Sequence, residues 1–209
     1  HCKDQLSGIN GVMRPGIVHR IDMDTTGVII ACKNDMAHNS IAAQLKEHSI
    51  TRRYQAIVHG VLKDDTGTID APIGRHPTDR KKMSINYNHG KNAVTHYKVL
   101  KRFRQYTHVE CRLETGRTHQ IRAHLAGTGH PLLGDYKYGS KKWNDRYKKE
   151  WKIEDQVLHA YQLTMPGMKK ELENLSGKTF YAKVPEVFWK LIKETAWEHG
   201  TREALEVLH

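Results

Sequence analysis

Two stretches of alternating apolar and polar residues, at 93–103 and 107–113, constrain the fold of this chain more than any other feature. They are separated by Arg104-Gln105-Tyr106, and the pattern predicts a β-hairpin. Further short strands are expected at 28–33, 53–58, 67–73, 157–165 and 179–184. Short strands mixed with few helices and joined by hairpin-like connections predict an α+β fold.

Two helices are expected within the first 130 residues. Asn34 can cap a helix in which apolar residues recur every four positions along one face. Thr118 is expected to cap a second, short helix over 119–126 that ends at Gly127. The apolar residues on the face of the first helix are Ala37, Ile41 and Leu45.

The last third of the chain holds one more helical signal. Pro185 opens a helix that is expected to end at Gly200, with residues 201–209 continuing it as a frayed end. The segment 139–152, rich in Lys, Trp and Tyr, is expected to be an exposed insertion. The apolar face of the last helix is formed by Val187, Leu191 and Ile192.

The charge of the chain indicates its partner. The 209 residues, enough for one domain with a sizeable core, include 34 Lys and Arg against 23 Asp and Glu, a formal charge of +11. Clustered Lys and Arg release counterions from phosphates when they bind nucleic acid. The simplest interpretation is a nucleic-acid partner, and the alternative is a basic protein that its charge keeps in solution.

Cysteine usage and hydropathy bear on the compartment. Cys2, Cys32 and Cys111 lie far apart, and no CxxC pair suggests a disulfide framework or a zinc site. No apolar run approaches the ~20 residues that cross a bilayer. We therefore expect a cytoplasmic protein without membrane contact, and a monomer.

The polar run that holds His19, Arg20 and Asp22 precedes the apolar residues 28–31. A histidine, an arginine and a carboxylate at the mouth of an expected strand are more typical of a working site than of a surface loop. Two later segments strengthen this interpretation, because each combines charged and aromatic groups with apolar residues. They are 52–58, which begins Arg-Arg-Tyr, and 113–124, which contains Gly-Arg-Thr-His-Gln-Ile-Arg.

These three segments, in this order, resemble the RluA/RluD-type family of RNA pseudouridine synthases. The family pattern around its essential aspartate is His-Arg-Leu-Asp, followed after a few residues by Thr-Ser-Gly. Here His19-Arg20-Ile21-Asp22 is followed by Thr25-Thr26-Gly27, and both departures conserve size and polarity. The resemblance extends to about residue 185.

The resemblance implies a fold and a domain organisation. It implies a mixed, mostly antiparallel curved sheet with flanking helices and a catalytic cleft. Residues 1–209 would form one catalytic domain. The family usually has an earlier strand region with a Lys-Pro pair, and often a small RNA-binding domain, and neither is found in this sequence. Since the chain starts at His1, we expect it to be truncated at its N-terminus.

The same resemblance implies an isomerase that converts uridine in RNA to pseudouridine. The reaction breaks the bond from ribose C1′ to uracil N1 and joins C1′ to C5. One carboxylate can serve as nucleophile or base, so no cofactor and no metal are expected. Asp22 matches the essential aspartate, Arg122 the arginine that pairs with it, and Tyr54 the tyrosine that lies against the uracil. The alternative interpretations are a cap or salt-bridged surface acid for Asp22, a phosphate-binding or surface arginine for Arg122 and a core aromatic for Tyr54.

A second set of residues is expected to bind RNA. Arg20 matches the family arginine that takes the place of a flipped-out base, although it could instead form an ion pair with Asp22. The loop around residues 75–83 resembles a mobile loop that grips RNA, and the start of the 119–126 helix could hold a phosphate. The full set is His19, Arg20, Arg75, Arg80, Lys81, Lys82, Arg117 and His119.

Three function hypotheses follow. The first is the isomerase, acting on 23S-type large-subunit ribosomal RNA or, as second choice, on transfer RNA. The second is an RNA-binding module without catalysis, in which Asp22 only orders the cleft. The third is a metal-dependent nuclease that uses Asp22 and Asp24.

Overall fold

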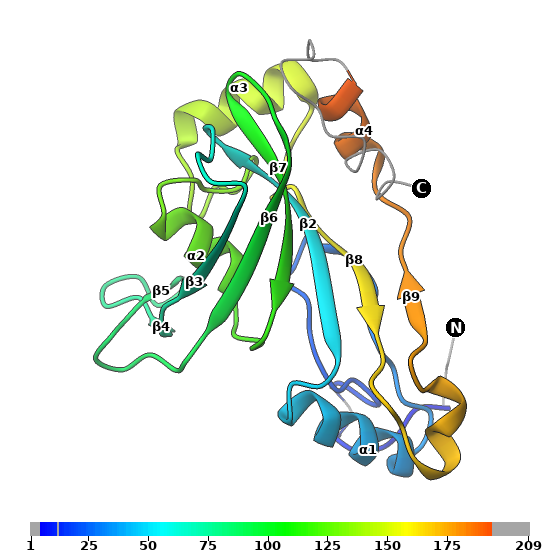
Figure 1. Cartoon of the computed structure of the whole chain (residues 1–209). Helices are drawn as coiled ribbons and strands as arrows, with labels where there is room; N and C mark the ends of the chain where they lie inside the picture. The colour runs from blue at the N-terminus through cyan, green and yellow to red at the C-terminus, as the bar shows by residue number, and fades with distance from the viewer. Residues whose placement is uncertain (1–4, 12, 194–209) are drawn as a thin grey trace.

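A single mixed sheet organises the molecule. The computed structural model describes residues 5–11 and 13–193. In this sheet β8 (Leu158–Thr164), β2 (Thr51–His59), β7 (Tyr106–Leu113), β6 (Val94–Arg102) and β3 (Thr66–Asp70) are neighbours in that order. All these pairs are antiparallel. The outer edge of β8 pairs in parallel with β1 (Thr26–Gly27) and antiparallel with β9 (Thr179–Tyr181). The expected α+β fold with a mixed, mostly antiparallel sheet is confirmed (Figure 1).

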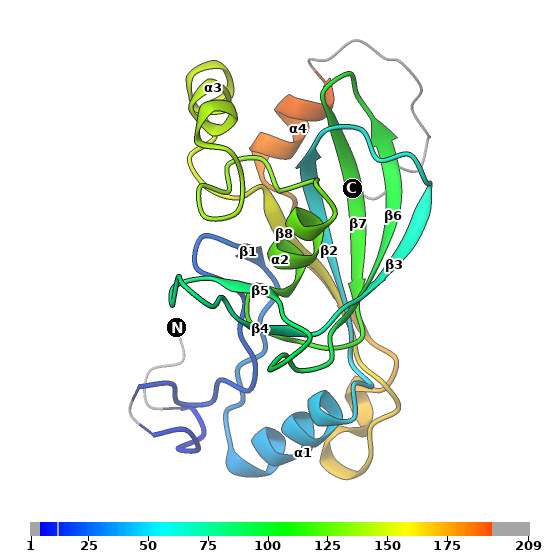
Figure 2. The same ribbon diagram turned by 90° about the vertical axis from the view of Figure 1, so that its left-hand side faces the viewer.

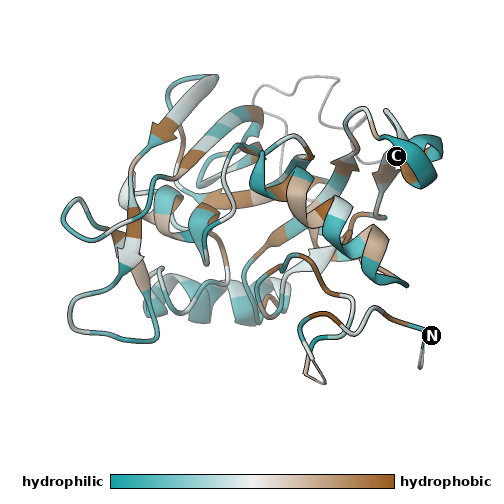
Figure 3. Ribbon diagram, turned by 90° about the horizontal axis from the view of Figure 1, so that it is seen from below, coloured by the Kyte–Doolittle hydropathy of each residue, from teal (hydrophilic) through white to brown (hydrophobic). Residues whose placement is uncertain are grey.

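The predicted hairpin forms the middle of this sheet. β6 and β7 pair from Thr95 opposite Leu113 to Arg102 opposite Thr107. Apolar and polar residues both occur along the strands, which Figure 3 colours in brown and teal bands. Because successive side chains of a strand point to opposite faces, the sheet has a core on each side.

The two cores receive different helices. On one face Tyr54, Ala56 and Val58 of β2 lie in a cluster with Ile121 and Leu125 of α2 (Gln120–Gly127), which lies in front of the sheet in Figure 2. The second cluster joins the sheet to α3 (Lys141–Trp151) and α4 (Glu186–Lys193). Its members include Ile57, Phe103, Tyr147, Phe188, Leu191 and Ile192.

A third cluster forms around α1 (Asp35–Lys46) at one end of the sheet. The Asn34 side chain accepts a hydrogen bond from the Ala37 backbone, so the predicted cap is confirmed. Ile41 of this helix is buried against Leu163 and Met168. Near it lies the short 3-10 helix η1 (Lys170–Leu175). A separate two-stranded ribbon, β4 (Ile73–Arg75) and β5 (Met83–Ile85), borders α2.

The prediction of a strand at 28–33 is wrong. Only Thr26 and Gly27 pair with β8, and among residues 28–33 only Ala31 makes an isolated bridge. Gly27 adopts φ +130, and a Cβ there would lie 2.2 Å from the Ala160 carbonyl oxygen. The chain turns away from the sheet at this close approach. The apolar side chains of Val28 and Ile30 pack beside α1 instead.

One further expectation is wrong, because Thr118 does not cap α2. His119 takes the cap position in a left-handed conformation, and no side chain caps the helix. The expectation for residues 139–152 is right only in part: most of these residues are exposed, but they form the regular helix α3, which buries Asn144 and Tyr147. The expected helix end at Gly200 and its continuation over 201–209 lie outside the described residues.

Candidate active site

The centre of the site is an ion pair between residues a hundred positions apart. Asp22 lies in the loop before β1, where its carbonyl accepts a hydrogen bond from the Thr25 backbone. Its Oδ2 is 3.5 Å from Nη1 of Arg122 on α2, and the two side chains are only 12% and 7% exposed. The fold therefore brings together Asp22 and Arg122, which the family resemblance implies to be a pair.

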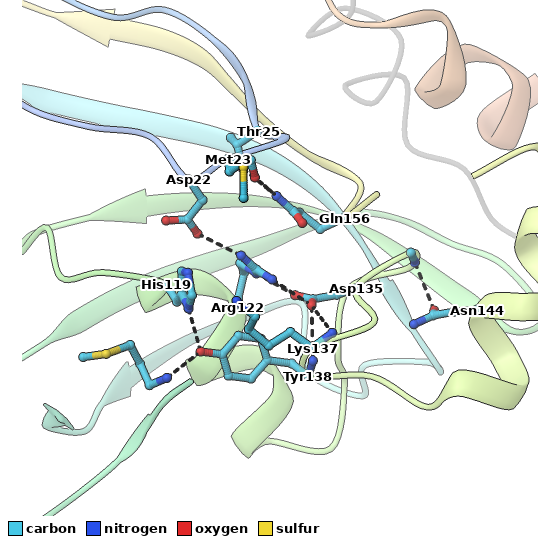
Figure 4. A network of polar contacts seen from close by, with 12 residues as sticks. Asp22, Met23, Thr25, His119, Arg122, Asp135, Lys137, Tyr138, Asn144 and Gln156 are labelled. Atoms are coloured by element: carbon cyan, nitrogen blue, oxygen red, sulfur yellow. Dashed lines mark hydrogen bonds and ion pairs between the residues drawn. The ribbon is translucent and has the colours of Figure 1, made fainter. Parts of the chain in front are cut away.

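A second carboxylate holds Arg122 from the other side (Figure 4). Arg122 donates from Nε and Nη2 to the two carboxylate oxygens of Asp135, at 2.7 and 2.9 Å. Oδ1 of Asp135 also accepts from the Lys137 and Tyr138 backbones. Burial lowers the pKa of Arg122, but the Asp135 hydrogen bonds and the charges of Asp135 and Asp22 outweigh it and raise the pKa. The guanidinium is thus fixed and charged, with Nη1 facing Asp22.

Asp135 and Tyr138 were missed by the sequence analysis. The Tyr138 ring lies 5.2 Å from the Arg122 guanidinium carbon, and Asp135 is 1% exposed. An acid directly after a glycine and the apolar pair Leu132-Leu133 was the available signal, because the preceding residues are buried. That signal does not name a partner, since the contact to Arg122 depends on the tertiary fold.

Tyr54 of β2 lies on the wall of the cavity that also contains Asp22. Its side chain is in contact with the core and 7% exposed. Burial raises the pKa of the Tyr54 phenol, and the Asp22 charge acts in the same direction against the opposing effect of Arg52. The phenol is therefore protonated at neutral pH and can donate its proton to a ligand.

The cavity has a volume of about 750 Å³. This lies within the range of ~300–1,000 Å³ that is usual for small-ligand sites. It is therefore large enough for a single nucleoside. Besides Asp22 and Tyr54, its wall includes four residues expected to bind RNA: His19, Arg20, Arg117 and His119.

Two histidines of this wall, His19 and His119, are held by hydrogen bonds. The Ile30 backbone donates to Nε2 of His19 at 2.9 Å, and burial followed by the Arg52 charge lowers the pKa of His19 to about 4. Burial also lowers the pKa of His119, whose Nδ1 lies 2.8 Å from the Tyr138 hydroxyl. The Met83 backbone donates to that hydroxyl, and the tautomer of His119 decides which group donates in the bond between its Nδ1 and the hydroxyl. Both imidazoles are neutral at pH 7.

The basic loop lies on the other side of the Asp22–Arg122 pair. Lys81 and Lys82 line a second hollow of about 530 Å³, together with Arg20, His119 and Arg122. Arg75 donates to the Arg80 carbonyl and braces the loop. The expected RNA-binding set is therefore divided between two adjoining hollows, and Arg75 and Arg80 do not line either of them.

Among residues 5–11 and 13–193, no group of three or more His, Cys, Asp or Glu side chains is arranged to hold a metal ion. Asp24, the second acid of the nuclease hypothesis, is exposed in a left-handed turn. No helix in this part of the chain has the length and apolar character of a membrane span.

Comparison with known proteins defines the class to which this site belongs. The profile of a family described as RNA pseudouridylate synthase matches residues 3–127. A human protein, RNA pseudouridylate synthase domain containing 1, has a similar structure with a TM-score of 0.72 at 27% identity. The match covers 92% of this chain and 77% of the human one.

Bacterial relatives narrow the class. The chain is 58% identical over 160 residues to YlyB, an uncharacterized RNA pseudouridine synthase of Bacillus subtilis, covering 77% of this chain and 50% of the relative. It is 46% identical over 197 residues to ribosomal large subunit pseudouridine synthase D of Zymomonas mobilis, covering 92% and 60%. The chain thus spans about half to three-fifths of the length of these relatives. It belongs to the RNA pseudouridine synthases and, within them, to the RluA family.

Proposed function

We propose that this protein is an isomerase that converts uridine in RNA to pseudouridine, with Asp22 as the essential group. The observation that carries the proposal is the ion pair between Asp22 and Arg122, in which Asp22 lines a nucleoside-sized cavity together with Tyr54. Membership of the RluA family supports the same activity.

The site supplies the groups that the reaction requires. A stacked uridine must first leave its helix, at a cost of a few kcal/mol, and Arg20 on the rim can take its place. The everted uracil then lies against Tyr54 with C1′ and the ribose near Asp22. Asp22 attacks the sugar or the base, or removes the ribose 2′ proton, while Arg122 fixes its orientation. The C1′–N1 bond breaks, the base turns and C1′ joins C5, which regenerates the Asp22 carboxylate. The C5 proton passes to water, and the Tyr54 hydroxyl on the cavity wall can relay it by accepting that proton and donating its own.

The proposed substrate is large-subunit ribosomal RNA. Several relatives, including those of Zymomonas mobilis and Pseudomonas aeruginosa, are named ribosomal large subunit pseudouridine synthase D. The formal charge of +11 is consistent with a polyanionic substrate. Transfer RNA is the alternative substrate and forms the second arm of the test.

Tritium release from uridine labelled at C5 tests the activity. The wild-type protein should release tritium from a large-subunit ribosomal RNA transcript, and Asp22→Asn should abolish release while RNA binding persists. Asp24→Asn is the matched control, because Asp24 is an exposed acid two residues away and should retain activity. Binding without release in the wild type would favour the non-catalytic module, and release only from a transfer RNA transcript would change the substrate.

A further inference from the structure

Arg52, a cation of the cavity wall, has no ion-pair partner among the described residues. Arg52 lies two residues before Tyr54 on β2, and both side chains line the cavity that contains Asp22. Arg52 is only partly exposed, and its Nε is buried without a hydrogen-bond partner among the described residues. No residue in this part of the chain forms an ion pair with it or accepts its hydrogen bonds. Arg122, by contrast, binds two carboxylates.

An unpartnered guanidinium at a partly desolvated position is costly for the free protein. Burial lowers the pKa of Arg52, which records this cost, although the Tyr54 oxygen opposes the effect. Arg53, the next residue, shows how such a charge is usually neutralised, namely by an ion pair. Arg53 points to the other face of the strand and pairs with Glu110 at 2.6 Å. The same strand thus carries one neutralised arginine and one whose charge is available to a ligand.

The surroundings of Arg52 select for an anion. Asp22 is the one carboxylate among the described residues that line this cavity, whereas several cations line it. The Gly116 turn passes so close to Arg52 that a Cβ at Gly116 would lie 2.5 Å from Nη1. The guanidinium is therefore confined between this turn and the cavity. The other cationic side chains of the wall are Arg14, Arg20, Lys46 and Arg117.

We propose that Arg52 binds the phosphodiester attached to the everted nucleoside, and so holds the RNA strand while the base occupies the site. This inference rests on the proposed function. Residues two apart on a strand are separated by about 6.6 Å along it, so a nucleoside on Tyr54 has its own phosphate within reach of Arg52. A guanidinium binds phosphate with two parallel hydrogen bonds, and Arg52 has its donors free to form them.

The salt dependence of RNA binding tests the proposal. In an Asp22→Asn background, Arg52→Gln should weaken binding to a large-subunit ribosomal RNA transcript about ten- to hundred-fold. The slope of log K against log salt should fall in magnitude by about 0.7 to 0.9, the value for one phosphate contact. Arg52→Lys should keep the slope and lose part of the affinity. Arg53→Gln, which removes the same charge from the opposite face, should leave the slope unchanged.

Thermal unfolding separates binding from a structural role. Arg52→Gln should leave the melting temperature of the free protein unchanged or raise it, because the guanidinium has no partner to lose. Arg53→Gln should lower it, because Glu110 loses its ion pair. A lower melting temperature in Arg52→Gln with an unchanged salt slope would overturn the proposal. Weaker binding without a change of slope would also overturn it, since the contact would then be to the base.

Tritium release distinguishes the two proposals. If the wild type releases tritium and the Arg52 variants bind like wild type, the phosphate contact is wrong and the isomerase proposal stands. If the wild type binds RNA with an Arg52-dependent slope but releases no tritium, the isomerase proposal is wrong and the phosphate contact stands.

Discussion

Two arginines of the site, Arg52 on the wall of the cavity and Arg122 on the adjoining hollow, differ in the partners that hold them. Arg122 is held by Asp135 and Asp22, and by the ring of Tyr138. Arg52 has a buried Nε without a hydrogen-bond partner in the described part of the chain. A saturated arginine has a fixed position and can orient a reacting carboxylate. An arginine without a partner, here called the bare arginine, keeps its hydrogen-bond donors and its charge available. An anionic substrate can therefore bind to it. Arg122, on the adjoining hollow, is therefore suited to orient Asp22, and Arg52, on the cavity wall, to attract an anion.

The largest effect on stability and activity is expected from a substitution of Asp135, the partner of Arg122. Asp135→Asn keeps an oxygen for the Lys137 and Tyr138 backbones but removes a buried charge that pairs with Arg122. Breaking a buried ion pair by removing one partner typically costs ~3–5 kcal/mol, so the free energy of unfolding in urea should fall by about 3 kcal/mol. Tritium release should fall at least tenfold, because Arg122 is no longer fixed toward Asp22.

Asp145→Asn is the matched control for this substitution. Asp145 pairs with Lys141 on the exposed side of α3, where an ion pair contributes little to stability. The unfolding midpoint and the tritium release of the Asp145→Asn protein should both match those of the wild type. If Asp135→Asn had the unfolding free energy of the wild type, the buried ion pair would not fix Arg122. The contrast between a fixed Arg122 and an unpartnered Arg52 would then be wrong.

The second effect is a pH dependence at the bare end, next to Arg52. The pKa of His19 is lowered to about 4 in the folded protein, from 6.5 in a free side chain. As the pH falls from 7 toward 4, His19 becomes protonated in the unfolded chain but stays neutral in the folded protein. The free energy of unfolding therefore decreases. Between pH 7 and pH 5 this loss is about 2 kcal/mol.

Urea unfolding at the two pH values measures this loss. His19→Gln should show a smaller decrease in stability than the wild type, by about 2 kcal/mol. An NMR titration adds a direct link to Arg52, because the Arg52 charge lowers the His19 pKa as the second cause after burial. Arg52→Gln should therefore raise the His19 pKa, and an unchanged titration would show that the charge of Arg52 is already neutralised.

The sequence predicted the local features of the site and missed those that depend on close approach. The hairpin of β6 and β7 and the Asn34 cap follow from alternation and local hydrogen bonding, so both were predictable. The strand at 28–33 failed because the contact between Gly27 and Ala160 depends on β8, which is far away in sequence. The sequence also suggested Asp22, Tyr54 and Arg122 together, through motifs.

The bond between Asp135 and Arg122 and the isolation of Arg52 could not be predicted in this way. Each depends on which side chains the fold brings near, and neither has a local pattern. The loop of Arg75 and Arg80 shows the same limit. That it binds RNA stays a prediction, and the hydrogen bond from Arg75 to the Arg80 carbonyl has no signal in the sequence. Charge composition predicts a partner for the molecule as a whole, but not which cation is free.

The smallest expected effect concerns the turn that confines Arg52. Gly116→Ala places a Cβ 2.5 Å from Nη1 of Arg52, at a glycine that lies outside the positive-φ conformations. The guanidinium is the end of a flexible side chain and can shift, so the melting temperature should change little. RNA affinity should fall several-fold, because the shifted guanidinium no longer presents both donors to a phosphate. Gly8→Ala, where an added Cβ meets nothing within 4 Å, is the control.

A double-mutant cycle shows whether this loss acts through Arg52. If Gly116→Ala weakens binding by displacing the guanidinium, it should have no further effect on an Arg52→Gln protein, and the coupling should equal the whole Gly116 effect. If the two losses add, the turn contacts RNA by itself, and the confinement of Arg52 has no role in binding. The cycle therefore tests whether Arg52 is held in position by steric contact with the Gly116 turn, whereas Arg122 is held by the charges of Asp22 and Asp135.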